Sequence, residues 1–245
     1  MKSHNTVLAI LLAYALAVPP GVGGQLTNIG AAGAVSGRVT AQATVQRSKI
    51  RVISSGKVLY YRDDIATNAK GRMQILLLDE TVFTVGPDTE LTLDEFVYDP
   101  FTETGKVTAS LTKGAIKFVS GRIAAKTPKN MKIVTPVGTI GVRGTAGSAW
   151  TDGKSVMVGN RGPGPNNNAK AKPGAVTLTG TDSKTGKRVS VEVRRVGSIA
   201  EIKSKGAAPI VRNGTPADWA KLTPTQKAKG SSKDDGPGGK AKASK

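Results

Sequence analysis

Three glycines and one arginine share a short segment, residues 135–145, with the sequence TPVGTIGVRGT. Gly138, Gly141 and Gly144 recur at every third position, and Arg143 lies between the last two. Glycine lets a backbone approach a phosphate or a neighbouring strand closely, and arginine adds five hydrogen-bond donors with a permanent charge. The segment could therefore form a phosphate-binding loop, a catalytic turn or a tightly packed strand.

The surrounding sequence favours the tightly packed strand. The dinucleotide-binding fingerprint requires G-x-G-x-x-G before a helix, and a Walker loop ends in Gly-Lys-Ser/Thr. Here the spacing is G-x-x-G-x-x-G, and Asp152-Gly153 then predicts a β-hairpin over residues 147–158. We therefore expect a structural motif without a catalytic role, which consists of Gly138, Gly141, Val142, Arg143, Gly144 and Thr145.

Arg143 is predicted to be buried and paired, because apolar residues flank it in the sequence. A buried guanidinium needs carboxylates or carbonyl oxygens as partners. Asp63, Asp64 and Asp79 lie on predicted turns and are the candidate partners. We expect Arg143→Ala to lower stability more than it alters binding; the alternative is an exposed arginine that recognises a ligand.

Acidic and aromatic side chains gather around residues 88–103, which contain Asp88, Glu90, Asp94, Glu95, Asp99 and Glu103. Two carboxylates could form a glycosidase pair, and several could bind Ca²⁺, but the Asp-x-Asp-x-Asp-Gly loop is missing. We expect a solvated strand face and turn. The nearby aromatics are either a sugar-stacking platform or part of the core and its rim: Tyr60, Tyr61, Phe96, Tyr98 and Phe101.

The first 24 residues have the features of a secretory signal peptide. Lys2 precedes an uncharged apolar run over residues 7–18, and Ala15-Leu16-Ala17 offers a cleavage site. The apolar run is shorter than the roughly 20 residues that span a bilayer. We therefore expect a periplasmic or secreted protein.

Export would leave the mature chain without imidazole or thiol groups. The sequence contains no cysteine, and its one histidine, His4, lies in the predicted signal peptide. Disulfides, Ser-His-Asp or Cys-His catalysis and histidine-ligated metal sites are then excluded. We therefore expect no catalytic residue, no cofactor and no metal.

The chain is strongly basic, with a formal net charge of +19. Such a charge suits an anionic partner, although it could also serve solubility alone. No motif for specific nucleic-acid recognition accompanies it. The expected partners are an envelope protein or an anionic polysaccharide, together with weak contact with an anionic membrane surface.

Short runs with alternating apolar and polar residues predict an all-β fold, an antiparallel sandwich or roll of short strands. Residues 25–48 are small and polar and predict a flexible lead-in. The main β domain covers residues 49–158, a Gly/Pro/Asn loop covers 159–174, and additional strands cover 175–205. Residues 206–245 predict a disordered lysine-rich tail with one short helix, capped by Thr215.

The block from about Lys57 to Trp150 resembles the FecR-type extracytoplasmic domain. The resemblance depends on an ordered series of segments: residues 56–93, which end in a Leu-Thr-Leu strand, GKVTASLTKGAIKFVSG over residues 105–121, and the closing Val-Arg-Gly-Thr of residues 142–145. It implies an all-β domain outside the cytoplasm. The family's named member relays an iron-citrate signal from an outer-membrane receptor to a cytoplasmic sigma factor.

Together these features predict an exported, non-enzymatic binding or scaffolding protein of the bacterial cell envelope. One alternative is a periplasmic regulator that relays a receptor signal to a sigma factor system. The other is a protein that binds or acts on polysaccharide, for which the carboxylates of residues 88–103 would be the catalytic candidates.

Overall fold

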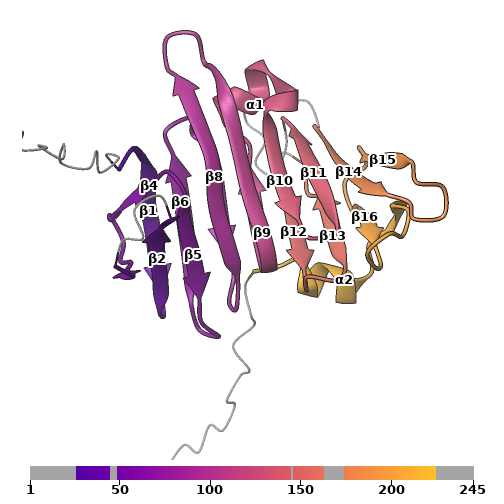
Figure 1. Ribbon diagram of the computed structural model, residues 1–245, viewed down its shortest axis with the longest axis horizontal. Helices are drawn as coiled ribbons and strands as arrows, with labels where there is room; N and C mark the ends of the chain where they lie inside the picture. The colour runs from indigo at the N-terminus through magenta and orange to yellow at the C-terminus, as the bar shows by residue number, and fades with distance from the viewer. Residues whose placement is uncertain (1–25, 45–48, 145, 163–173, 225–245) are drawn as a thin grey trace, which may run out of the picture.

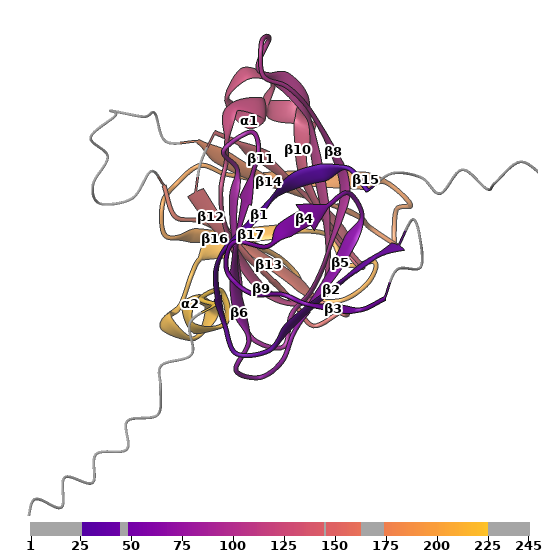
Figure 2. The same cartoon turned by 90° about the vertical axis from the view of Figure 1, so that its left-hand side faces the viewer.

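The computed structural model describes residues 26–44, 49–144, 146–162 and 174–224 (Figures 1 and 2). Its strands pair into one continuous hydrogen-bonded system that folds into two layers. The first sheet contains, in spatial order, β4 (Val58–Tyr60), β1 (Asn28–Ser36), β6 (Arg72–Leu77), β7 (Val82–Val85), β9 (Thr104–Val119), β12 (Ala146–Thr151), β13 (Val156–Asn160), β16 (Ser198–Ile202) and β17 (Ile210–Asn213). The second sheet contains β3 (Arg51–Val52), β2 (Val39–Ala43), β5 (Asp63–Thr67), β8 (Glu90–Asp99), β9, β10 (Met131–Thr135), β11 (Gly138–Arg143), β14 (Ala175–Thr181) and β15 (Arg188–Val193).

The two sheets form a β-sandwich, which confirms the predicted all-β class. Figure 2 shows them from the side, with β5 and β8 of the second sheet on the right and β12 and β16 of the first sheet on the left. Their inward-facing side chains, mostly Val, Ile, Leu and Ala with Phe83 and Phe118, pack into one main core. Alternating burial along β2 and β5 shows the period of two that half-buried strands require.

Strand β9 joins the two sheets because it bends at Gly114. Its first half pairs with β8 and β10, and its second half pairs with β7 and β12. Gly114 has φ +97°, and a Cβ atom there would lie 2.2 Å from Thr89 Oγ1, so only glycine fits the bend. The bend brings both ends of β9 to the same end of the sandwich, where Arg122 binds Glu80 and Glu103.

A short helix closes that end of the sandwich and changes the direction of the next strand. Helix α1 (Arg122–Lys126) buries Ile123 and Ala124, and a 3₁₀ turn (Pro128–Asn130) leads into β10. After this crossover β10 runs parallel to β9, whereas all other strand pairs of the described chain are antiparallel. The sheet is therefore mixed, which corrects the expectation of purely antiparallel pairing.

The predicted flexible lead-in is wrong for its described part. Residues 28–36 and 39–43 form β1 and β2, and both strands bury side chains in the core, among them Ile29 and Val39. Their small residues allow close packing: a Cβ atom on Gly30 would lie 2.2 Å from the Leu76 carbonyl oxygen. A composition that resembles a linker thus serves strand packing here.

The C-terminal region is more ordered than predicted. Residues 210–213 form β17, and α2 (Pro216–Lys221) begins at Thr215, whose side chain and that of Asp218 form the capping box. The predicted short helix is thus confirmed.

The predicted 159–174 loop begins too early, since Gly159 and Asn160 end β13. Residues 1–25, 45–48, 145, 163–173 and 225–245 lie outside the described structure, and with them the predicted signal peptide, most of that loop and most of the tail.

The hairpin predicted at 147–158 is confirmed as β12 and β13, with Gly153 at φ +87° in its turn. The strands of residues 175–205 divide between the sheets and do not form one separate addition. β14 and β15 extend the second sheet, whereas β16 pairs with β13 in the first.

Helix α2 covers part of the outer face of the first sheet, where a second small core lies. Trp219 fits above two glycines: a Cβ atom on Gly159 or Gly214 would lie 2.5 Å from its indole. Met157, Ile199 and Leu222 complete this core together with Trp150. Arg212 connects β17 to the helix, since it binds Glu201 at 2.8 Å and Asp218 at 2.6 Å.

This attachment is expected to weaken in acid. Hydrogen bonds from Arg212 hold the pKa values of Asp218 and Glu201 below their usual range. A lowered pKa in the folded state stabilises the fold above the ordinary carboxyl pKa of about 4, and this stabilisation is lost as the pH falls through the folded-state values. Between about pH 6 and about pH 3, the free energy of unfolding should therefore fall more in the wild type than in Asp218→Asn.

Urea unfolding, followed by Trp219 fluorescence in a Trp150→Phe background, measures this difference. Equal losses in the two proteins over that pH range would show that the Arg212 contacts do not couple the helix to pH.

Candidate functional site

The predicted glycine–arginine motif lies in the middle of the second sheet. β10 and β11 form a hairpin, and β11 pairs on its other side with β14. Ile140 and Val142 point into the core and are fully buried, so the alternate residues Thr139, Gly141 and Arg143 face outward. The motif therefore builds part of the outer surface of this sheet.

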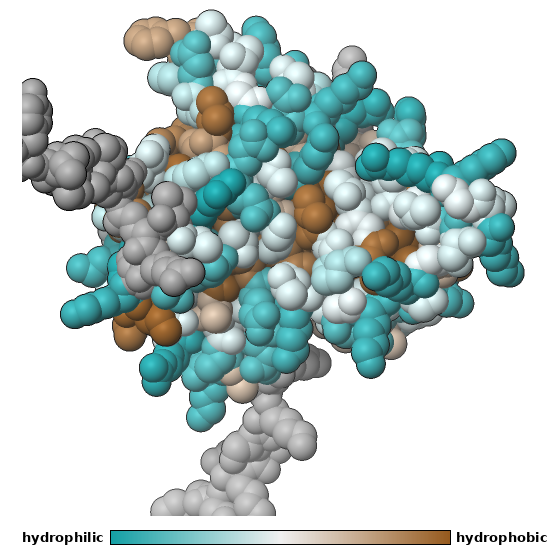
Figure 3. Space-filling model, viewed as in Figure 1, coloured by the Kyte–Doolittle hydropathy of each residue, from teal (hydrophilic) through white to brown (hydrophobic). Residues whose placement is uncertain are grey.

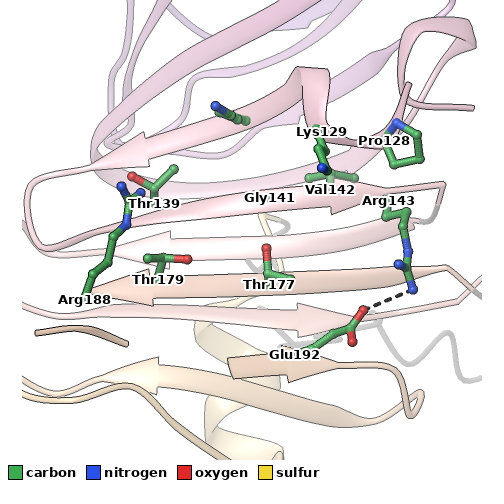
Figure 4. Close-up of a pocket in the computed structure, with 11 residues that line it drawn as sticks. Pro128, Lys129, Thr139, Gly141, Val142, Arg143, Thr177, Thr179, Arg188 and Glu192 are labelled. Carbon is green, nitrogen blue, oxygen red and sulfur yellow. Dashed lines mark ion pairs between the residues drawn. The ribbon is translucent and has the colours of Figure 1, made fainter. Parts of the chain in front are cut away.

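A groove of about 370 Å³ crosses β10, β11, β14 and β15 on this surface (Figure 4). Gly141 forms its floor: a Cβ atom there would lie 2.5 Å from Thr177 Oγ1, so glycine leaves the space open. Lys132, Gly141, Thr177 and Glu192 are cross-strand neighbours in one transverse row. The pairing register thus decides which side chains line the groove.

The other two glycines of the motif have different roles. A Cβ atom on Gly138 would lie 2.8 Å from Ile202 Cδ1, so this glycine permits close packing against the first sheet. Gly144 has φ +59° and ends β11, with no atom near its missing side chain. Thr145 lies outside the described residues.

Arg143 differs from its prediction. Its side chain is 53% exposed and pairs with Glu192 at 3.1 Å, not with any of the three predicted aspartates. The apolar neighbours that suggested burial point to the opposite face of the same strand. An exposed ion pair contributes about 0–1 kcal/mol, so a large loss of stability in Arg143→Ala is no longer expected.

The three candidate aspartates have other partners. Asp63 is buried and binds Arg51 at 2.5 Å. Asp64 accepts hydrogen bonds from the hydroxyls of Thr44 and Thr92, and Asp79 accepts two from Thr81.

Positive charge dominates the groove. Lys129, Lys132, Arg143 and Arg188 line it together with one carboxylate, Glu192. Glu192 is already shared between Arg143 and Arg194, at 3.1 and 2.8 Å. Among the residues that the structure describes, no carboxylate lies within ion-pair distance of Lys129, Lys132 or Arg188. The groove is therefore suited to an anionic ligand.

Hydroxyl groups cover the groove between its charged ends. Thr139, Thr177 and Thr179 line it, and Thr179 is hydrogen-bonded to Ser190 at 2.6 Å. Arg188 lies at one end and Arg143 with Glu192 at the other (Figure 4). The outer face of the second sheet, which faces the viewer in Figure 3, is largely hydrophilic, with isolated apolar residues.

The acidic cluster of residues 88–103 does not form one site. Glu95 pairs with Lys106 at 2.7 Å, Glu103 pairs with Arg122, and Asp99 accepts hydrogen bonds from Phe101 N and Thr102 within its turn. These hydrogen bonds lower the pKa of Glu95 and of Asp99. Across the described ranges, no three His, Asp or Glu side chains gather as metal ligands.

The five aromatic residues near this cluster are divided between β4 with its following turn, β8 and the β8–β9 turn. Tyr60 stacks under Arg51 and Tyr61 under Arg62, whereas Phe96 and Tyr98 lie 6.4 Å apart on β8. Phe101 is 97% exposed in the β8–β9 turn. Phe96 belongs to the main core, and Tyr61 and Tyr98 pack against it, as expected for the core and its rim.

Sequence reasoning missed most of the groove. Lys132, Thr177 and Arg188 lie on three strands that are distant in the sequence, and no local motif connects them. The alternation of Thr177 and Thr179 with buried residues was the one available signal of a hydroxyl-bearing face.

No helix in the part of the chain that the structure describes is long and apolar enough to cross a membrane.

Comparisons with known proteins identify the domain that contains the motif. Two solved structures of a Parabacteroides distasonis protein, provisionally described as an anti-sigma factor, are 14% and 13% identical, with TM-scores of 0.44 and 0.42. Each alignment covers 61% of this chain and 59% of that one. No curated protein matches the chain. Residues 63–159, from the start of β5 into β13, match the family model for FecR protein, so the resemblance is confirmed and the chain carries a FecR domain.

Proposed function

We propose that this protein is a regulatory component of signal transduction at the bacterial cell envelope, which acts by binding and not by catalysis. The FecR match over residues 63–159 is the observation that carries the proposal. The matched segment includes strands of both sheets and the outward-facing motif of β11. The match favours regulation over the scaffold expected from the sequence, because the named member of the FecR family relays a signal.

A regulator of this kind needs a surface for a protein partner, and the outer face of the first sheet offers one. Val58, Leu76 and Val119 are 37%, 41% and 49% exposed there. Ala31 lies between the first two and Val82 between the last two, so the five side chains form one row across the sheet. Exposed apolar patches of this kind mark interaction sites.

The same outer face is already covered at its other end. Helix α2 places Trp219 and Leu222 over β13 and β16, whereas no described element covers the row Val58–Ala31–Leu76–Val82–Val119. We name this row the apolar row. Its chemistry fits a partner that presents an apolar surface of its own.

The proposal predicts a transcriptional phenotype that depends on the apolar row. Deleting the gene in its source organism should change the transcription of a defined set of genes, and the wild-type chain should restore it. The double variant Leu76→Glu/Val119→Glu should fail to restore it, since it would bury two unpaired charges in an apolar interface, which is costly. RNA abundance is the measurement.

Val97→Glu is the matched control, because Val97 is 61% exposed on β8, on the outer face of the second sheet. It should restore transcription like the wild type. The melting temperature of each variant checks that the fold is intact. A deletion strain with an unchanged transcript profile would refute the regulatory function, and full activity of the double variant would refute the role of the apolar row.

A further inference from the structure

We propose that the groove of the second sheet is a binding site for a linear acidic glycan, whose carboxylates pair with the groove cations and whose hydroxyls bind the threonines. This site would give the regulator a ligand, and it lies on the face opposite the apolar row. The proposal does not depend on the transcriptional function, since it concerns direct binding by the isolated chain.

The size and shape of the groove fit a short segment of a polymer. It crosses four neighbouring strands, which at about 4.8 Å per strand interval corresponds to roughly 14 Å. Gly141 keeps the centre of its floor open, and Thr177 lies directly beside that glycine in the pairing register. Its charged ends, Arg188 and Arg143 with Glu192, are separated along the strand direction, so a linear ligand that reaches both would lie along the strands (Figure 4).

Two cations of the groove can bind an anion without first losing a carboxylate partner. Lys132 and Arg188 are exposed and are not engaged in ion pairs with described carboxylates. Both residues lie on paired strands, which fix the backbone positions from which the two side chains reach the groove. Lys132 and Arg188 lie at opposite corners of the groove in the pairing register, so a polymer with carboxylates on several units can reach both cations at once.

The hydrogen-bonding groups favour a glycan over an acidic peptide. β11 lies between β10 and β14, and β14 lies between β11 and β15, so the backbone groups of these central strands are already paired. An extended peptide on this face would find few partners for its own amides and carbonyls. The hydroxyls of Thr139, Thr177 and Thr179 can donate and accept, as can the hydroxyls of a sugar chain.

Calorimetric titration of the full chain with oligogalacturonate, at about physiological salt to screen non-specific charge, tests the proposal. Lys132→Glu and Arg188→Glu should each weaken binding by about tenfold or more, because each replaces an attractive charge by a repulsive one. Thr177→Val should weaken it by about threefold to tenfold, since it removes one hydroxyl and keeps the shape. Melting temperatures confirm that each variant folds.

Lys117→Glu is the matched charge control, because Lys117 is exposed on the outer face of the first sheet. It should bind oligogalacturonate like the wild type. Three further ligands test the contributions separately. Polyphosphate tests charge alone, a neutral dextran tests hydroxyls alone, and polyglutamate tests an acidic peptide. The proposal predicts that none of the three matches oligogalacturonate in affinity.

Several outcomes would overturn the proposal. Absence of binding by the wild type is one, and unchanged affinity in Lys132→Glu and Arg188→Glu is another. An equal loss in Lys117→Glu would show that only net charge matters. Tighter binding of polyglutamate, with the same dependence on the groove residues, would assign the site to an acidic peptide instead.

Discussion

Replacing Asp63 by alanine is expected to lower the free energy of unfolding by about 3–5 kcal/mol, the range for a buried charge that loses its partner. Asp63 is fully buried at the start of the FecR domain. One carboxylate oxygen binds Arg51 at 2.5 Å, and the other accepts a hydrogen bond from the Tyr60 amide at 2.8 Å. Without this carboxylate, the Arg51 guanidinium, which is only 28% exposed, loses its counter-charge, and the Tyr60 amide loses its acceptor.

Urea unfolding of the wild type and Asp63→Ala measures this loss. Asp64→Ala is the neighbouring control: its carboxylate faces outward and binds two hydroxyls, so its loss should stay below about 1.5 kcal/mol per hydrogen bond. The double variant Arg51→Met/Asp63→Leu should recover most of the loss, because apolar residues can replace a buried ion pair. The assignment fails if Asp63→Ala costs no more than Asp64→Ala.

Phe118→Ala is expected to destabilise the fold by about 3–5 kcal/mol, as large-to-small changes of buried aromatics do. Phe118 is 1% exposed on the half of β9 that belongs to the first sheet, directly opposite Phe83. On its other side lies Gly147, where a Cβ atom would be 2.4 Å from Phe118 Cζ. The ring therefore occupies the space that a side chain at Gly147 would need.

This contact predicts that the effects of Phe118→Ala and Gly147→Ala on stability are not additive. Gly147→Ala alone should cost about 1–3 kcal/mol through overpacking, and it should cost less in the Phe118→Ala background, where the methyl group has room. Phe101→Ala, at a position that is 97% exposed, should change stability by less than about 0.5 kcal/mol. Chemical denaturation of the wild type, Phe118→Ala, Gly147→Ala and the double variant provides the comparison. Strictly additive losses would contradict the proposed contact.

Local signals in the sequence were sufficient for several elements. Asp152-Gly153 predicted a hairpin because its turn needs a positive φ, and Gly153 has one. Thr215 predicted the start of α2, since capping depends on neighbouring residues alone. The order of segments up to Val-Arg-Gly-Thr identified the FecR domain. In each case, the information lies within a few residues or in their order along the chain.

Features that depend on which strands become neighbours were not predictable in this way. The small residues of β1 resemble those of a linker, and only the contact of Gly30 with Leu76 shows why they are small. Arg143 was expected in the core because its neighbours are apolar, but strand alternation places them on opposite faces.

By itself, the sequence determined the all-β class, the FecR domain and the position of the glycine–arginine motif, because periodicity, turn chemistry and segment order are properties of the chain. The tertiary structure alone decided that Lys132, Thr177 and Arg188 share a groove above Gly141. Their proximity follows from the registers of β10 with β11, β11 with β14 and β14 with β15. Such registers are set by the packing of the whole sandwich, since a shift by one residue would turn every side chain of a strand to the other face.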